Sequence, residues 1–422
     1  MSIGEAKEAF SRDTQDVPQQ RPAHGRASGP LLVFILSDSI RGHLSQSRGI
    51  AGWLSRFTGA DIVEIDVPRI TGKRRVELLK VKGRRLPKMN SCDILVWLDE
   101  TGGSALFDTM KRELASRKLT GKDALFLAAG GSAAPFALAL AKMTRGKSCV
   151  LMTPSALGTA PFDFAVVPAH DRPRLTHNLL ATLGAPNAIF PDELERKGWE
   201  LAELYPPVES AERRWGLLVG GDDANYAVTA DWVRRTIAPI FSAAAKEEAD
   251  LYITTSRRTT PEAEEALTRL AAGRSHVRLL LLASRDEFNP VAGMLGLCSR
   301  LFVTEDSVSM VSEAITAGRE VFLLRTDRKG KLRVALQDLT AWLVRRKLLP
   351  PGLLWGKPRF DALFDVLERR GFLKEMQPRA LRRSSAGGAS LHADGPVLNE
   401  ARRAAEWIVE RWGEAWKEQG RP

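Results

Sequence analysis

The first apolar run of the chain ends in a polar segment, residues 37–46, that contains Asp38, Gly42 and His43. The pKa of an unperturbed imidazole is about 6.5, so His43 could take or give a proton near neutral pH. Asp38 could orient that imidazole or act as the base itself, and Gly42 would let the backbone come close to a ligand. We predict a loop here, with a helix beginning near residues 47–49. The alternative is a turn in which His43 is merely hydrogen-bonded and Asp38 is a cap.

A pair of glycines, Gly220 and Gly221, follows the apolar run at residues 215–219. Free backbone amides at a strand end, together with a helix dipole, attract anions, so this pair could cradle a phosphate. Asp222 and Asp223 come next and would repel a phosphate unless they cap the following helix or point away. The alternative is therefore a purely structural turn.

Two arginines lie at the next predicted strand end. The apolar run at residues 251–255 is followed by Ser256, Arg257 and Arg258, and Pro261 suits the first turn of the helix expected there. The guanidinium fork matches phosphate oxygens, which favours a phosphate-binding loop. The alternative is a solvated surface, where paired arginines are also common.

The most informative segment joins an apolar run, residues 301–304, to a predicted helix. Ser307 would cap that helix, and Ser309, Ser312 and Glu313 recur at the spacing of one helix face. Hydroxyls and amides at a helix start suit a pyrophosphate, and a carboxylate one turn further in can accept hydrogen bonds from ribose hydroxyls. The alternative is ordinary capping with a solvated glutamate.

These candidate residues all follow predicted strands, and the strands alternate with predicted helices twice along the chain. Such alternation is typical of parallel sheets covered by helices, so we predict the α/β class with two Rossmann-like domains. Ligands bind such sheets at the carboxyl ends of the strands, near the point where the strand order reverses. The expected strands are residues 31–36, 61–67, 93–98, 124–128, 149–152 and 164–167, and then 215–219, 251–255, 277–282, 301–304 and 321–324.

The expected domain organisation has five parts. A Tyr-Pro-Pro sequence at residues 205–207 marks the boundary between the two domains, and Ala404, Ile408 and Trp412 have the spacing of an amphipathic helix. We expect that last helix to pack back across the domains. The parts are a disordered tail at residues 1–29, a first domain at 30–207, a second domain at 208–375, a flexible loop at 376–394 and the C-terminal helix within 395–422.

The charge of the chain favours an anionic partner. The 422 residues carry a formal net charge of +11, and residues 69–88 supply most of it, with nine Lys or Arg residues against Glu77 alone. Interleaved basic and apolar groups suit an anionic lipid surface, at about 1 kcal/mol per basic residue. The alternatives are a solvated hairpin and, less favoured because no aromatic residue lies in the run, nucleic-acid binding.

Several other classes of site are disfavoured. The sequence contains no HExxH, Walker A, GxSxG or GxGxxG pattern, and its three cysteines lack CxxC spacing. We therefore predict no metal site, no cofactor and a reducing compartment. Residues 1–29 do not resemble a signal peptide, and glycine and proline interrupt the longest uncharged stretch, residues 124–141. We expect a cytoplasmic protein, soluble or peripheral on a membrane.

Taken together, the motifs resemble the mitochondrial-fission family of bacterial glycosyltransferases, which is named after a plant member. The resemblance runs from about Leu31 to Trp412 and implies the GT-B fold, with two facing Rossmann-like domains. The Ser-Glu helix is also similar to that of the peptidoglycan lipid-intermediate N-acetylglucosaminyltransferase. In that enzyme the matching glutamate holds the nucleotide ribose, and a Gly-His loop faces the transferred sugar. The matching segments here are Gly42-His43 with Gln46 and residues 166–171, 182–186, 219–221, 254–259, 289–290 and 306–314.

The resemblance implies a metal-independent glycosyltransferase of cell-envelope biosynthesis that uses a nucleotide diphosphate sugar as substrate. The first domain would hold a lipid-linked or lipopolysaccharide-type acceptor at the inner membrane, with His43 or Asp38 as base. Gly42, Gln46, His170 and Asp171 would face that acceptor or the cleft. The nucleotide would be bound by Gly220, Gly221, Ser256, Arg257, Arg258, Ser307, Ser309, Ser312 and Glu313. Two alternatives stay open: a non-catalytic membrane or protein adaptor of the same fold, and a nucleotide-sugar epimerase.

Overall fold

The computed structural model describes residues 29–413 apart from residues 172, 209–211, 224, 330–335, 337–338, 341, 344–345, 347, 349–359 and 377–397. The described residues divide into two compact units. The first unit comprises residues 29–188 and 399–413, and the second comprises residues 189–398. The predicted tail at residues 1–29 and the predicted loop at 376–394 lie almost wholly outside the described residues.

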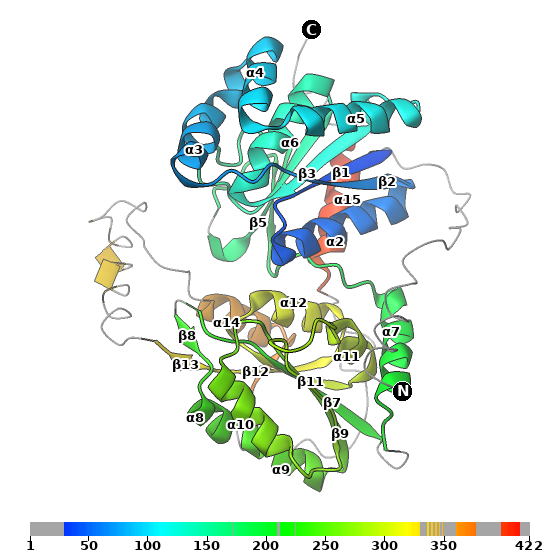
Figure 1. The fold of residues 1–422 in the computed structure, drawn as a ribbon, viewed down its shortest axis with the longest axis vertical. Coiled ribbons are helices and arrows are strands. Elements are labelled where there is room, and N and C mark those ends of the chain that lie inside the picture. The colour runs from blue at the N-terminus through cyan, green and yellow to red at the C-terminus, as the bar shows by residue number, and fades with distance from the viewer. Residues whose placement is uncertain are drawn as a thin grey trace. The chain divides into compact units, whose positions relative to one another are not determined.

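A six-stranded parallel sheet forms the centre of the first unit, in the order β2-β1-β3-β4-β5-β6 (Figure 1). Leu32, Phe34 and Leu36 pack with α4, α5 and α6 on one face, whereas Val33 and Ile35 pack with α2 and α15 on the other. Strands buried on both faces are expected to be continuously apolar, as β1 and β3 are. The bounds are β1 (Leu32–Ser37), α2 (Arg41–Thr58), β2 (Asp61–Asp66), α4 (Ser91–Thr101), α5 (Ser104–Ser116), β3 (Ala124–Ala129), α6 (Gly130–Thr144), β4 (Lys147–Leu151), β5 (Phe164–Pro168), β6 (Leu179–Thr182) and α15 (Glu400–Trp412).

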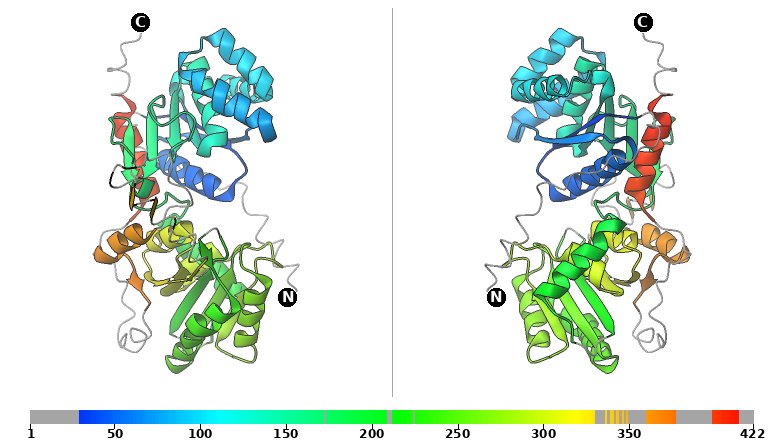
Figure 2. Two further views of the ribbon diagram at one scale, coloured as in Figure 1. Left: turned by 90° about the vertical axis from the view of Figure 1, so that its left-hand side faces the viewer. Right: turned by 90° about the vertical axis from the view of Figure 1, so that its right-hand side faces the viewer.

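The second unit repeats this design with the strand order β10-β9-β7-β11-β12-β14, all parallel. Trp215, Leu217 and Val219 face a helical layer that includes α9 and α10, and α11 and α12 contact the sheet from its other side (Figure 2). The bounds are α7 (Pro191–Leu204), β7 (Arg213–Val219), α8 (Ala230–Trp232), η5 (Val233–Ile237), α9 (Ala238–Lys246), β9 (Ala249–Thr255), α10 (Pro261–Ala271), β10 (Val277–Leu281), α11 (Val291–Leu297), β11 (Arg300–Thr304), α12 (Val308–Thr316), β12 (Glu320–Leu324), α14 (Asp361–Arg369) and β14 (Lys374–Glu375), and the short strands β8 (Tyr226–Ala227) and β13 (Asp327–Arg328) form a separate antiparallel pair.

The predicted class, α/β with two Rossmann-like domains, is confirmed, but one predicted strand is wrong. Residues 93–98 belong to helix α4, whose start is capped by Asn90, which accepts a hydrogen bond from the Asp93 backbone amide. Ile94, Trp97 and Leu98 are buried at helical spacing, whereas Val96 is exposed. A short apolar run fits a strand and a buried helix equally well, so its composition alone could not decide.

Two predicted boundaries also differ from the structure. Helix α2 begins at Arg41 rather than near residues 47–49, because its first turn is polar and carries no apolar residue until Leu44. The units divide between residues 188 and 189 rather than at 207. Helix α7 belongs with the second unit because it packs closely on α11, where Gly198 lies against Gly296.

The strand order reverses once in each sheet. In the first unit β2 and β3 lie on opposite sides of β1, so the reversal falls between β1 and β3. In the second unit β9 and β11 flank β7, and the reversal falls between β7 and β11. The loops that leave these strand pairs at their carboxyl ends are the expected ligand sites of doubly wound sheets.

Candidate functional site

The reversal point of the first unit holds an Asp–His pair. Nδ1 of His43 lies 2.9 Å from Oδ2 and 3.1 Å from Oδ1 of Asp38. The Asp38 side chain is only 7% exposed, whereas that of His43 is 24% exposed. Ile40 donates its backbone amide to the same carboxylate at 3.2 Å, which holds Asp38 in place at the end of β1. When Nδ1 donates to the carboxylate, Nε2 of the imidazole is the nitrogen that can accept a proton.

The imidazole of His43 lies against the first residue of α6, Gly130. A Cβ atom at Gly130 would be 2.5 Å from Cε1 and 2.9 Å from Nδ1 of the ring, and its φ angle is +79°. No side chain could occupy this position with the ring where it is. Gly130 was not among the predicted site residues, although a Gly-Gly pair after a predicted strand is a signal that could have identified it.

The other predicted residues of the first unit lie near this pair to different degrees. Gly42 and Gln46 are in the first turns of α2, half-buried and one helical turn apart, rather than in a loop. His170 and Asp171 follow β5, with Nε2 3.7 Å from the Asp171 carboxylate. Burial lowers the pKa of His170, and the Asp171 charge opposes that shift. Because β5 is two strands from β3, these two residues lie roughly 10 Å further along the same edge of the sheet.

The glycine pair of the second unit is engaged within the protein. Gly220 donates its amide to Oγ1 of Thr304 at 2.7 Å, and Gly221 donates to Oδ2 of Asp306 at 3.0 Å. These two amides are therefore not the free phosphate donors that the sequence suggested. The glycines are needed for a steric reason: a Cβ atom at Gly220 would lie 2.0 Å from the Asp306 carboxylate.

The acidic pair after these glycines is turned into its own loop. Asp222 accepts a hydrogen bond from the Val228 amide at 2.9 Å and pairs with Lys329 at 2.7 Å. Asp223 accepts from the amides of Asn225 and Tyr226. Both carboxylates thus accept hydrogen bonds from amides of their own loop and do not cap the following helix α8, whose N-cap is Thr229.

The arginine loop after β9 is joined to the same region. Nη2 of Arg258 lies 2.7 Å from Oδ2 of Asp306, and the Arg258 amide donates to Oγ of Ser256 at 3.1 Å. The hydroxyl of Thr259 donates to the Gly220 carbonyl at 2.6 Å. Arg257 is exposed. The strand ends β7, β9 and β11 thus meet around one buried carboxylate, Asp306, which the sequence analysis missed.

Helix α12 brings the predicted Ser-Ser-Glu group to the same strand end. Ser307 is its N-cap and accepts from the Met310 amide at 3.4 Å. Ser309 and Glu313 are half-buried one turn apart, and Ser312 is buried. Burial raises the pKa of Glu313 to about 7, and no charged group of the described chain contributes to that shift. A half-buried carboxylate that has no cation of the described residues beside it can accept hydrogen bonds from a ligand.

The basic segment of the first unit is helical, not a hairpin. It consists of α3 (Gly72–Arg75), the π-helix η1 (Val76–Lys82) and the 3-10 helix η2 (Gly83–Lys88). Leu78, Leu79 and Leu86 are buried, whereas Val76 and Val81 are exposed among the basic residues. We call the segment from α3 to the end of α4, residues 72–101, the helical insertion.

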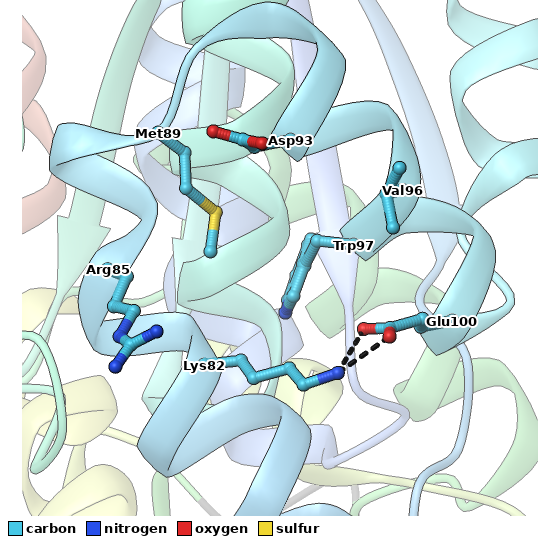
Figure 3. Close-up of a pocket in the computed structure, with 7 residues that line it drawn as sticks. All are labelled: Lys82, Arg85, Met89, Asp93, Val96, Trp97 and Glu100. Carbon is cyan, nitrogen blue, oxygen red and sulfur yellow. Dashed lines mark hydrogen bonds and ion pairs between the residues drawn. The ribbon is translucent and has the colours of Figure 1, made fainter.

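A groove of about 330 Å³ lies on this helical insertion, between η1–η2 and α4 (Figure 3). Nζ of Lys82 reaches across to the Glu100 carboxylate at 2.6 Å. Basic, acidic and apolar side chains therefore all line the groove. Its lining residues are Lys82, Arg85, Met89, Asp93, Val96, Trp97 and Glu100.

The part of the chain that the structure describes contains neither a metal-binding cluster nor a membrane-spanning helix. Within it, no three His, Cys, Asp or Glu side chains are grouped so that they could hold a metal ion. None of the described helices combines the length and the apolar character that a transmembrane helix requires.

Comparison with known proteins gives a family and a fold. Residues 41–412 match the sequence model of a family described as mitochondrial fission ELM1. No curated protein matches the sequence. Among solved structures, UDP-GlcNAc 2-epimerase from Methanocaldococcus jannaschii has a TM-score of 0.50 at 11% identity, covering 91% of this chain and 99% of that one. At such identity the likeness shows the fold alone.

Two further structures have lower scores. MurG from Acinetobacter baumannii has a TM-score of 0.40 at 13% identity and covers 91% of this chain and 100% of its own. UDP-GlcNAc 2-epimerase from Neisseria meningitidis, which was solved bound to UDP-GlcNAc, has a TM-score of 0.45 at 11% identity. The match covers 91% of this chain and 99% of that one. The predicted family and the predicted GT-B fold class are confirmed.

Proposed function

Since the chain belongs to the mitochondrial fission ELM1 family, we propose that it is a metal-independent glycosyltransferase. It would move a sugar from a nucleotide sugar to a lipid-linked or lipopolysaccharide-type acceptor at the inner membrane, as a cytoplasmic, peripheral protein of cell-envelope biosynthesis that needs no cofactor. The observation that carries this proposal is the Asp38–His43 pair at the point where the strand order of the first sheet reverses. A partly exposed imidazole oriented by a buried carboxylate is suited to accept a proton from a hydroxyl.

In the proposed reaction the first unit binds the acceptor and activates it. Nε2 of His43 takes the proton of the acceptor hydroxyl while the oxygen attacks the anomeric carbon of the sugar. The bond between that carbon and the donor's diphosphate oxygen breaks, and the diphosphate leaves with the electron pair. Asp38 stabilises the imidazolium that forms and keeps the ring in the tautomer that has its lone pair at Nε2.

The second unit would bind the donor. Arg258, Arg257 and Ser256 offer charged and neutral donors to the diphosphate, and the start of α12 at Ser307 and Ser309 adds the positive end of a helix dipole. Glu313, one turn further in, would accept hydrogen bonds from the ribose hydroxyls. Because the amides of Gly220 and Gly221 are engaged, the glycines in this proposal shape the loop rather than donate to the phosphates. The buried Ser312 would support the same face of the helix.

The acceptor would arrive from an anionic membrane through the helical insertion and the basic residues just before it. Val76, Val81, Leu95 and Val96 are exposed there among the Lys and Arg side chains. Apolar side chains can enter the headgroup layer while each basic residue near the surface contributes about 1 kcal/mol. Binding of the insertion to nucleic acid finds no support, because its buried Trp97 offers no face for stacking.

The experiment uses the full-length protein with uridine, guanosine, cytidine and thymidine diphosphate sugars and an anionic lipid extract. We expect one donor to transfer labelled sugar to the lipid phase. His43→Ala should lower the rate at least a hundredfold without changing donor affinity, while His177→Ala, at an exposed histidine outside the site, should leave it unchanged. Absence of binding to any nucleoside diphosphate would exclude the transferase and favour the adaptor.

A nucleotide-sugar epimerase is the second candidate, because the fold is shared with the Methanocaldococcus jannaschii epimerase. An epimerase needs no acceptor. Conversion of a nucleotide sugar into its epimer in the absence of lipid would therefore favour this candidate over the transferase.

A further inference from the structure

Asp306 ties together three loops at the strand-order reversal of the second unit. Its side chain is 0% exposed. Oδ2 accepts a hydrogen bond from the Gly221 amide at 3.0 Å and from Nη2 of Arg258 at 2.7 Å. These partners come from the loops after β7 and β9, and Asp306 itself follows β11.

The loops approach each other so closely around this carboxylate that a Cβ atom fits at neither Gly220 nor Gly221. A Cβ atom at Gly220 would lie 2.0 Å from Oδ1 and 2.2 Å from Oδ2 of Asp306, and one at Gly221 would lie 2.1 Å from the backbone of Arg258. The backbone of Arg258 is also fixed, since its carbonyl accepts the Asp222 amide at 2.9 Å. An apolar side chain at position 306 would leave both the Gly221 amide and the guanidinium without their acceptor, and a neutral amide would keep an acceptor oxygen but lose the charge that pairs with Arg258.

Asp306 and the Asp222 carbonyl contact the terminal nitrogens of the Arg258 guanidinium, and part of the side chain remains exposed. Nη2 binds Asp306, and Nη1 lies 3.4 Å from the Asp222 carbonyl, while 40% of the side chain is exposed. A guanidinium has five N–H donors in a rigid plane, so fixing one edge determines where the others point.

We propose that Asp306 is a positioning residue for nucleotide binding, which orients Arg258 toward the donor's diphosphate. This inference rests on the proposed function of the second unit. It goes further because it assigns a favourable role to Asp306, whose negative charge alone would be expected to weaken diphosphate binding. If Asp306 acts on the diphosphate only through its negative charge, removing that charge should raise the affinity for the diphosphate. If Asp306 positions the Arg258 guanidinium, removing the charge should lower that affinity.

The test measures affinity by calorimetry for the tightest of UDP, GDP, CDP and dTDP and for its parent nucleoside. Asp306→Asn should weaken diphosphate binding at least tenfold and leave nucleoside binding unchanged. Asp222→Asn is the matched control, because it removes the same charge from the same region at a half-exposed position; we expect its affinity to stay within threefold of wild type or to improve. In Arg258→Met, adding Asp306→Asn should cause no further loss.

The possible outcomes distinguish the positioning role of Asp306 from the proposed function. If Asp306→Asn binds the diphosphate as tightly as wild type or more tightly, the positioning role is wrong while the proposed function stands. If wild type binds none of the four diphosphates, the proposed function fails and the positioning role fails with it. If Asp306→Asn does not fold, Arg258→Lys is the second test, because lysine keeps the positive charge but lacks the planar fork. We expect Arg258→Lys to bind the diphosphate at least tenfold more weakly than wild type. An unchanged affinity would overturn the inference.

Discussion

Lys147, the first residue of β4, donates a hydrogen bond to the backbone carbonyl of Trp412, the last residue of α15. Lys147 is 2% exposed, and its Nζ lies 4.6 Å from the ring centroid of Trp412 and 5.6 Å from that of Phe164. A cation at this place satisfies a carbonyl that the helix leaves unpaired and complements the helix dipole. The C-terminal helix is thus fastened to the first unit by a buried lysine far away in the sequence.

The buried lysine predicts a pH-dependent stability. Burial lowers the pKa of Lys147 to about 8 from its ordinary 10.5. Between these values the unfolded chain binds more protons than the folded one, so the stability of the wild type rises with pH across that window. Relative to Lys147→Met, whose side chain does not titrate, the wild type should gain up to about 3 kcal/mol between pH 8 and pH 10.5. Urea unfolding of both proteins at several pH values measures this difference, and a constant difference would contradict it.

Gly130 predicts a second effect, on catalysis. Gly130→Ala would place a methyl group 2.5 Å from Cε1 of His43 at a positive φ angle, so the imidazole must move away from Asp38. We expect the transfer rate to fall about a hundredfold with little change in donor affinity.

The neighbouring glycine provides the control for that substitution. A Cβ atom at Gly131 would meet nothing within 4 Å, and Gly131 has no positive φ angle. Gly131→Ala should therefore keep the wild-type rate. Equal rates in the two variants would show that the position of the imidazole does not matter for transfer.

Asp38 provides the third prediction. Asp38→Asn removes the charge that stabilises the imidazolium and offers Nδ1 an amide whose oxygen and nitrogen are both available, which permits the wrong tautomer. The rate should fall on the order of a hundredfold. Asp66→Asn, at the exposed end of the neighbouring strand β2, removes one charge at the same edge of the sheet and should have no such effect. Initial rates at saturating donor separate the two.

The strands of both sheets were largely predictable because they are covered on both faces. Residues such as Phe34 and Leu217 lie in unbroken apolar runs, as is typical of strands in a parallel sheet that helices cover on both faces. Helix α4 was not predictable in this way. The exposed apolar residues Leu95 and Val96 lie between the buried residues Ile94 and Trp97, so the sequence shows a continuous apolar run instead of helical spacing.

The candidate site was predictable only where its residues lie close together in the chain. Asp38 and His43 are five residues apart, and their pairing follows from a single strand end. Gly130 and Asp306 act through loops far away in the sequence: Gly130 contacts His43, and Asp306 contacts Gly220. No local pattern reports such a contact, because it depends on which strands are neighbours in the sheet.

Glu313 predicts a pH dependence of donor binding. Its pKa of about 7 lies above the ordinary 4.5, so the carboxyl group loses its proton as the pH rises through neutrality. The ionised form accepts hydrogen bonds from both ribose hydroxyls, and donor affinity should therefore increase from pH 6 to pH 8. Glu313→Gln should bind more weakly and without this dependence. A nucleotide sugar is the right probe, because its diphosphate does not titrate in this range, and a flat wild-type profile would contradict the role.

The helical insertion predicts attachment to anionic membranes. Lys80 and Arg85 are exposed beside Val81 and Val96, so removing both charges in a Lys80→Ala, Arg85→Ala variant should cost about 2 kcal/mol of binding to phosphatidylglycerol vesicles, or roughly thirtyfold. Raising the salt concentration should weaken the wild type more than this variant, because fewer charges remain to be screened. Lys246→Glu, at an exposed position of α9 in the second unit, is the control and should leave vesicle binding unchanged. If co-sedimentation with these vesicles responds equally to both variants, net charge rather than the insertion determines attachment.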